Sequence, residues 1–117
     1  MREGAIKIEE FERLDLRIGR IKDAARIEGS KKLIKLEVDI GSGDEHEHGR
    51  NRQLVAGIAD EYKPEELIGK LVPVLVNLEP KKLMGVESQG MLLAVSVDGK
   101  PVLLHPDKDV PPGSRVC

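Results

Sequence analysis

One segment of the chain alternates strictly between apolar and charged residues, and it constrains the fold more than any other feature. From Ile34 to Ile40 every second residue is Ile, Leu or Val, and each residue between them is charged. Successive side chains of a strand point to opposite faces, so this period of two predicts a strand with one buried and one solvated face. Lys35, Glu37 and Asp39 are expected on the solvated face.

Shorter apolar runs, separated by glycine, proline and polar residues, recur along the rest of the chain. Pro64 suits the first position of a helix, and Gly69 suits the residue after its end. Asp98 followed by Gly99 is typical of a hairpin turn. Gly19 interrupts the first strand and changes its parity, which predicts a bulge or a bend. The expected elements are a helix at 8–14, strands at 14–18, 34–40, 53–58, 71–78, 91–97 and 102–104, a helix at 62–69, and polar loops at 41–52 and 80–89.

Many short strands with one helix between the third and the fourth are typical of a small all-β barrel. We predict a five-stranded Greek-key barrel of the OB type, with a short N-terminal helix and extra C-terminal strands. Another small barrel or a sandwich would satisfy the same periodicity. The length of 117 residues suits one domain, residues 1–117.

The composition excludes several classes of protein. With 19 Lys and Arg against 21 Asp and Glu, the chain is neither a basic tail nor a disordered polyanion. One Phe, one Tyr and no Trp cannot form a stacking platform for single-stranded nucleic acid, so an RNA partner would be recognised through its shape and phosphates. Cys117 is the single cysteine, which fits a reducing, cytoplasmic compartment, and no apolar run is long enough to span a membrane.

No motif predicts catalysis, a cofactor or a metal site. The residues around Gly69 lack the first glycine and the hydroxyl that a phosphate-binding P-loop needs. Ser88 has no identifiable base, which argues against a hydrolase. His46 and His48 stand two apart in the acidic loop and could hold a metal ion weakly, but a solvated hairpin tip is the simpler interpretation.

Basic and acidic residues are separated along the chain. Lys31 and Lys32 share one turn, and Lys35 follows on the solvated face of the next strand. Lys81 and Lys82 occupy the predicted loop at 80–89. Positions 41–66, in contrast, hold 7 acidic and 3 basic residues. In the folded barrel the lysines are expected either to form one basic face or to be ordinary solvated side chains.

A family resemblance is most specific at residues 77–94, which read NLEPKKLMGVESQGMLLA. They resemble the signature N-L-x-P-R/K-K-M/L-x-G-x-x-S-x-G-M-x-L-A of a tRNA-binding domain and meet each of its fixed positions. Segments 11–18, 33–41, 54–58 and 62–70 resemble other parts of the same domain, so the resemblance covers about residues 8–116. The chain is most similar to the archaeal methionyl-tRNA synthetase beta-subunit type.

The resemblance implies an OB fold with extra C-terminal strands, binding of tRNA near its elbow, and homodimerisation. It also implies a non-catalytic role as an appendage of methionyl-tRNA synthetase, whose catalytic subunit becomes an expected partner. The apolar segments 71–78 and 102–104 fill the core or, alternatively, form the dimer interface. CsaA-type secretion chaperones share the barrel, but their loop usually lacks the Ser88–Met91 segment. A peptide-binding chaperone and a scaffold without a ligand are therefore the alternative functions.

The implied binding residues fall into three chemical groups. The lysines supply positive charge for phosphates. Ser88 and Gln89 offer hydrogen bonds to ribose or phosphate, and Asn77 does the same or closes the turn. Met91 packs on a base or sugar, or in the core, and Arg17 contacts a phosphate or forms a salt bridge with Asp15 or Glu37. The complete set of candidate tRNA-binding residues is Arg17, Lys31, Lys32, Lys35, Asn77, Lys81, Lys82, Ser88, Gln89 and Met91.

Overall fold

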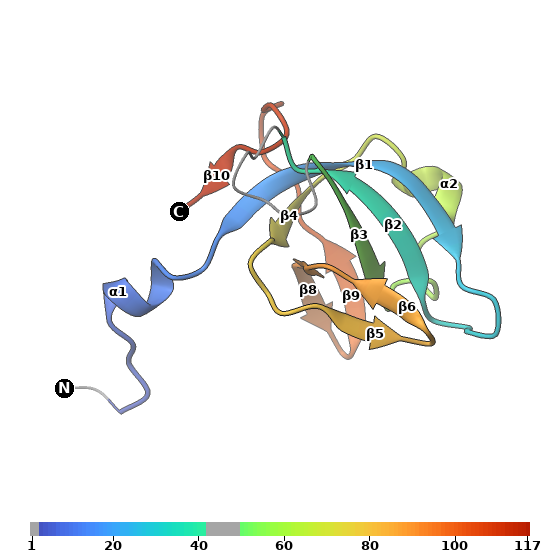
Figure 1. Ribbon diagram of the computed structural model, residues 1–117, viewed down its shortest axis with the longest axis horizontal. Helices are drawn as coiled ribbons and strands as arrows, with labels where there is room; N and C mark the ends of the chain where they lie inside the picture. The colour runs from blue at the N-terminus through green and yellow to red at the C-terminus, as the bar shows by residue number, and fades with distance from the viewer. Residues whose placement is uncertain (1–2, 42–49) are drawn as a thin grey trace.

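A long, bent strand organises the main sheet of the computed structural model, which describes residues 3–41 and 50–117 (Figure 1). In chain order the elements are α1 (Ile8–Phe11), β1 (Leu16–Arg26), β2 (Ile34–Asp39), β3 (Asn51–Ala56), α2 (Pro64–Leu67), β4 (Leu71–Leu75), β5 (Lys81–Leu83), β6 (Val86–Ser88), β7 (Met91–Leu92), β8 (Ala94–Val97), β9 (Lys100–Leu103) and β10 (Arg115–Val116). The main sheet has the order β3-β2-β1-β4-β7 with antiparallel neighbours, and β10 pairs with the start of β1. β5 with β6, and β8 with β9, form two further hairpins.

β1 pairs with strands in both halves of the main sheet because it bends. Its first half pairs with β4 and its second half with β2, and the register with β2 shifts between Ile21 and Asp23. The sequence predicts this bend at Gly19, three residues before the shifted position. A Cβ at Gly19 would collide with the side chain of Val38 on β2. Gly19 therefore allows the close approach of the two strands, and the irregular pairing follows it.

The β5–β6 hairpin is hydrogen bonded to β3, an outer strand of the main sheet, and this connection nearly closes the barrel. The N–H of Gln89, just after β6, donates to the carbonyl oxygen of Gln53 on β3 at 2.8 Å. The N–H of Val55 on β3 donates to Oγ of Ser88 on β6 at 3.0 Å. α2 lies between β3 and β4 in the chain. The predicted all-β barrel of the OB type, with its short helix between the third and fourth strands, is thus confirmed.

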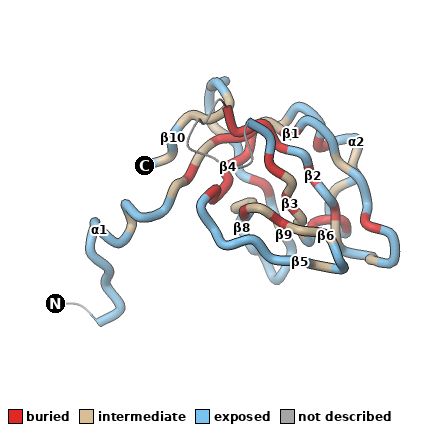
Figure 2. Tube along the Cα trace, in the orientation of Figure 1, coloured by how far each residue is buried: buried red, intermediate tan, exposed pale blue. Residues whose placement is uncertain are grey.

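The barrel interior holds the apolar face that the sequence predicts for residues 34–40. Ile34, Leu36, Val38 and Ile40 have no exposed surface. Figure 2 shows that burial is concentrated on the strands of the barrel, whereas the N-terminal segment is exposed. Complete burial of side chains of this size stabilises a fold by about 1.5–3 kcal/mol each, so the face of β2 that points inward accounts for much of the core.

Asp39 departs from the predicted alternation. The sequence predicts a solvated side chain, but the residue is only 8% exposed. The N–H of Gly41 donates to its Oδ1 at 2.8 Å, and Nε of Arg50 donates to the same oxygen at 3.1 Å. Burial by itself raises the pKa of the Asp39 carboxyl. The hydrogen bonds and the charge of Arg50 outweigh that effect and hold this pKa below its usual value.

Both helices are shorter than predicted. α1 covers four residues instead of 8–14, and none of the four is buried. Apolar periodicity predicts a longer helix, but Ile8 and Leu14 are exposed rather than packed on the barrel. α2 begins at Pro64 as predicted, and Gly69 follows it with a φ of +90°. No helix within the two described ranges is long and apolar enough to cross a membrane.

Several strand boundaries differ from the prediction because pairing, rather than local polarity, sets them. β3 begins at Asn51, inside the predicted polar loop, because Asn51 pairs with the end of β2. The predicted strand at 91–97 is divided at Leu93, where the chain leaves the main sheet. β4 ends at Leu75, and residues 71–76 are all buried in their own barrel, so this part of the predicted segment fills the core. β9 starts at Lys100 rather than at 102, and β10 is too short to show a pattern.

Candidate nucleic-acid interface

The segment predicted as a loop at 80–89 forms a β-hairpin of β5 and β6. Lys81 pairs with Ser88 and Lys82 with Glu87. The connecting residues Met84 and Gly85 have φ values of +53° and +79°, which is the geometry of a type I′ turn. The loop prediction is therefore wrong. The sequence does not predict this hairpin because Met-Gly is not a usual sequence for a hairpin turn.

Ser88 attaches this hairpin to the barrel. The residue is 6% exposed. Its Oγ accepts the N–H of Val55 at 3.0 Å and donates to the carbonyl oxygen of Gly90 at 3.0 Å. Nε2 of Gln53 donates to the carbonyl oxygen of Glu87 at 2.8 Å and adds a second connection. The hydroxyl of Ser88 thus lies inside the molecule and orients the hairpin, rather than facing a ligand.

Gln89 and Arg52 extend the same connection. Oε1 of Gln89 accepts the N–H of Gln53 at 3.0 Å. Nη1 of Arg52, a residue only 5% exposed, donates to the carbonyl oxygens of Val76 at 2.7 Å and Gln89 at 2.8 Å. The sequence predicts a polar loop that includes Arg52. A signal was present, because Arg52 has the same parity as Leu54, which is completely buried on β3.

Gly90 connects the β5–β6 hairpin to β7, at a point where the chain packs closely against β4 and β3. Its φ is +158°, and a Cβ there would lie 2.9 Å from the carbonyl oxygen of Leu75 and 3.1 Å from Cδ2 of Leu54. A side chain at this position would push β7 away from β4. Met91 follows on β7 and is 45% exposed, so it lies at the surface and not in the core.

The structure brings together the lysines of two distant segments. Gly29, with a φ of +87°, lies in the connection between β1 and β2. A Cβ added at Gly29 would lie 3.5 Å from Cε of Met84, at the tip of the β5–β6 hairpin. Figure 1 shows these two tips side by side at the lower right of the barrel. The exposed lysines of the two segments therefore border one edge of the molecule, which we name the basic rim: Lys31, Lys32, Lys81 and Lys82.

Lys35 lies apart from the basic rim, on the outer face of β2. It borders a hollow of about 110 Å³ together with Asp23, Glu37 and Gln53. Asp23 and Glu37 are directly opposite each other in the β1–β2 register. Two carboxylates beside one ammonium group repel phosphate, so the sheet face is less suited to an RNA backbone than the rim.

Arg17 and Asn77 lie near the other end of β1. Nε of Arg17 donates to Oδ1 of Asp15 at 2.8 Å, which is one of the salt bridges considered from the sequence. Oδ1 of Asn77 accepts the N–H of Asp15 at 2.8 Å, and its Nδ2 donates to the carbonyl oxygen of Arg13 at 2.7 Å. Arg17 is separated from the end of β1 by nine residues, or roughly 30 Å of strand. Asn77 fixes residues 13–15 beside the chain that follows β4, whereas the Arg17 salt bridge is local, and neither side chain is part of the basic rim.

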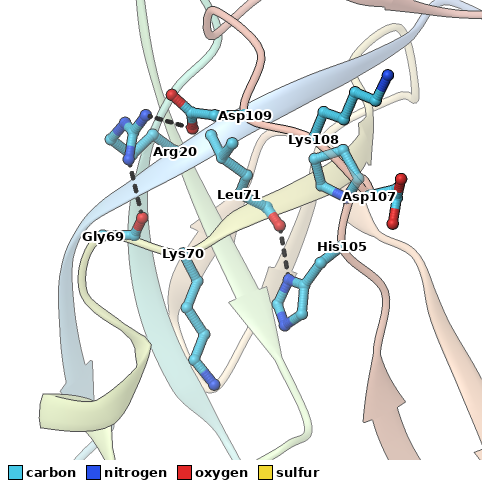
Figure 3. A pocket seen from close by; sticks show the side chains of 9 residues that line it. Arg20, Gly69, Lys70, Leu71, His105, Asp107, Lys108 and Asp109 are labelled. Atoms are coloured by element: carbon cyan, nitrogen blue, oxygen red, sulfur yellow. Dashed lines mark hydrogen bonds and ion pairs between the residues drawn. The ribbon is translucent and has the colours of Figure 1, made fainter.

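A second concave surface lies between β1, the end of α2 and the chain after β9 (Figure 3). Its volume is about 400 Å³. Nη1 of Arg20 donates to the carbonyl oxygen of Gly69 at 3.0 Å, and its Nη2 lies 3.6 Å from Oδ1 of Asp109. Nδ1 of His105 is 2.8 Å from the carbonyl oxygen of Leu71. Because its cations alternate with carboxylates and carbonyls, this groove is a poorer match for a polyanion than the basic rim.

Metal-ligating residues do not gather in the part of the chain that the structure describes. Within residues 3–41 and 50–117, no group of three or more His, Cys, Asp or Glu side chains is placed to hold a metal ion. His46 and His48, the pair considered from the sequence, lie outside the described residues.

Comparison with known proteins identifies the family. Residues 16–115 match the family described as "Putative tRNA binding domain". The methionine–tRNA ligase of Archaeoglobus fulgidus is 60% identical over 112 residues, which are 96% of this chain and 16% of that protein. The methionine–tRNA ligase of Methanothrix thermoacetophila is 55% identical over 111 residues, 95% of this chain and 15% of that protein. The chain thus spans only a small part of these relatives.

Solved structures of whole chains match as well. The MetRS related protein from Pyrococcus horikoshii superposes with a TM-score of 0.86 and 43% identity, covering 100% of both chains. The chaperone CsaA from Bacillus anthracis gives a TM-score of 0.82 and 35% identity, covering 97% of this chain and 100% of that one. The fold is therefore shared by both groups, but the family match spans nearly all of the sequence, and the chain belongs to the tRNA-binding domain family.

Proposed function

We propose that this chain binds folded tRNA through the basic rim and performs no catalysis of its own. The observation that carries the proposal is the meeting of two exposed lysine pairs, from the β1–β2 connection and from β5, at one edge of the barrel. The hairpin that carries Lys81 and Lys82 is hydrogen bonded to β3 through buried Ser88. The hairpin backbone is thus held in place, and the exposed lysines of the two segments, with Glu87 directly opposite Lys82, offer positive charge to the phosphates of a structured RNA.

Recognition of shape, rather than of unstacked bases, follows from the aromatic residues. Oη of Tyr62 accepts the N–H of Leu103 at 3.1 Å, and Nζ of Lys70 lies 5.4 Å from the ring centroid. Phe11 belongs to α1, at the other end of the molecule from the rim (Figure 1). Neither ring can stack a base at the rim, so we propose that the chain binds a folded region such as the tRNA elbow.

We propose that the biological role is to supply tRNA affinity to a methionyl-tRNA synthetase. The chain matches a small part of whole methionine–tRNA ligases. A tRNA-binding module held near a catalytic subunit raises the effective concentration of tRNA and so lowers the apparent KM. The chain would act as a beta subunit or a trans-acting appendage, and the catalytic subunit is the proposed partner.

We also propose that two copies associate through the N-terminal segment. Ile6, Ile8 and Leu14 are exposed on a segment that projects from the barrel in Figures 1 and 2. Ile6 and Leu14 border an apolar groove of about 420 Å³ that also includes Leu75 and Leu78. Exposed apolar residues that gather in this way mark association surfaces. Sedimentation of Ile6→Asp should show a monomer, and an unchanged mass at the same concentration would refute this interface.

The test of tRNA binding compares a folded tRNA with a denatured RNA of equal length at about 0.15 M salt. We expect the wild-type chain to prefer the folded tRNA. The double variant Lys81→Glu with Lys82→Glu should weaken binding at least about 30-fold and reduce the salt dependence, because two phosphate contacts are lost. The matched control is Lys100→Glu with Lys108→Glu, which changes the net charge equally with exposed lysines outside the rim.

Equal binding of the folded and denatured RNA, or equal losses in the two double variants, would contradict the proposal. The alternative is a CsaA-like peptide-binding chaperone, which the similarity to solved CsaA structures favours. That function predicts binding of an unfolded apolar peptide that the Lys81 and Lys82 substitutions leave unchanged. The two functions therefore give opposite results with the same variants.

A further inference from the structure

Met84 is unfavourably placed in two independent respects. Its φ of +53° lies in the left-handed region, which unbranched apolar residues rarely adopt. Its side chain is 59% exposed, so it adds nothing to the buried core. Strained backbone and exposed apolar surface both cost free energy, and such positions gather at functional sites.

The surroundings of Met84 restrict what it can contact. A Cβ added at Gly29 would lie 3.5 Å from Cε of Met84, so the methionine side chain lies beside the β1–β2 connection. The lysines of the basic rim flank it on both segments: Lys31, Lys32, Lys81 and Lys82. The exposed apolar group therefore stands within the area that the proposed function gives to RNA.

We propose that Met84 is an RNA contact that packs on the flat face of an exposed nucleobase or base pair while the rim lysines hold the phosphates. This inference rests on the proposed function, which it deepens by naming the chemistry of the contact. A protein partner fits less well, because the cores of protein interfaces are depleted of charged residues and both segments that meet at this methionine carry exposed lysines. The thioether is polarisable and makes favourable contacts with ring faces, which compensates for the absence of aromatic residues at the rim.

The decisive variant is Met84→Asn, because it should move stability and affinity in opposite directions. Asn tolerates the left-handed conformation better than Met, so thermal stability should be unchanged or higher. Affinity for folded tRNA should fall about fivefold, since roughly half of a methionine side chain no longer packs on the RNA. The salt dependence should be unchanged because no charge is altered. Met84→Leu, which keeps an apolar side chain, should bind within about twofold of wild type.

The control is Val97→Asn, which removes a half-exposed apolar residue from the other hairpin and should leave the affinity for tRNA unchanged. Wild-type affinity in Met84→Asn would overturn this inference and leave the proposed function intact. A changed salt slope in Met84→Asn, or an equal loss in Met84→Leu, would also overturn it, because the effect would then come from displaced lysines. If wild type itself shows no preference for folded tRNA, the proposed function fails first.

Discussion

The β5–β6 and β8–β9 hairpins have the same turn geometry but different turn sequences. Met84 and Gly85 have φ values of +53° and +79°, and Asp98 and Gly99 have +52° and +79°. Asp-Gly is a preferred sequence for this turn, whereas Met-Gly is not. The backbone φ values are nearly equal in the two turns, so the methionine stands at position 84 against the preference of the turn. This difference indicates where surface chemistry, and not folding, determines the residue.

The two hairpins also expose different surfaces. β5 carries exposed Lys81 and Lys82, which suit an anionic partner. β8 and β9 expose Val95, Val97 and Val102, and Val95 is directly opposite Val102. Cross-strand valines form an apolar surface beside Lys100, which is directly opposite Val97. One type of supersecondary unit therefore occurs twice in the molecule, once with exposed lysines and once with exposed valines.

Gly90→Ala should have the largest effect, because it affects the junction that places the first hairpin. Its Cβ would lie 2.9 Å from the carbonyl oxygen of Leu75, so β7 must move. We expect a loss of about 2–4 kcal/mol in the free energy of unfolding, measured by urea denaturation. The control is Gly99→Ala in the second hairpin, where nothing lies within 4 Å and only about 1 kcal/mol of backbone strain is expected. Equal losses would show that close approach at Gly90 is unimportant.

Ser88→Ala should rank second. It leaves the N–H of Val55 and the carbonyl oxygen of Gly90 without the hydroxyl they share. The expected loss is about 1–3 kcal/mol, since buried polar groups without partners are costly. Hydrogen exchange at the Val55 amide should accelerate, and tRNA affinity should fall because the hairpin is less firmly held. Unchanged exchange at Val55 would contradict this attachment.

Tyr62→Phe tests the attachment of the second hairpin and should cost less. The phenol oxygen accepts a single hydrogen bond, from the N–H of Leu103 at 3.1 Å. Removal of this acceptor should lower the free energy of unfolding by about 1 kcal/mol, seen as a lower Tm. Affinity for tRNA should not change, because the basic rim lies on the other hairpin. A loss of affinity comparable to that of Ser88→Ala would show that the hairpins are coupled.

The fold was predictable where local pattern and pairing agree. The alternation at 34–40, Pro64 at the start of α2 and the Asp98-Gly99 turn each have a local signature, and the structure confirms them. Asp39 was misplaced because its partners come from Gly41 and Arg50, which no periodicity reveals. The β5–β6 hairpin was missed because Met84 stands where a turn residue would be expected.

The site was predictable only in part. The rim lysines were identified from charge and from the family signature, and they are exposed. The same signature suggested Ser88 and Asn77 as ligand contacts, but their hydrogen bonds are used inside the chain. A family pattern marks residues that the domain needs. It does not distinguish residues that contact a ligand from residues that stabilise the fold. Position 84 is open in that pattern, so only the structure draws attention to it.

Asp98→Met should have the smallest effect, and it tests the premise of the comparison. The substitution places in the second turn the residue that the first turn already contains, at nearly the same φ. We expect a loss of about 0.5–1 kcal/mol in the free energy of unfolding, because Asp tolerates the left-handed conformation better than Met. Folded tRNA should bind as tightly as before. If Asp98→Met costs nothing, the turn accepts methionine without strain, and the exposure of Met84 among four lysines alone supports its role in RNA binding.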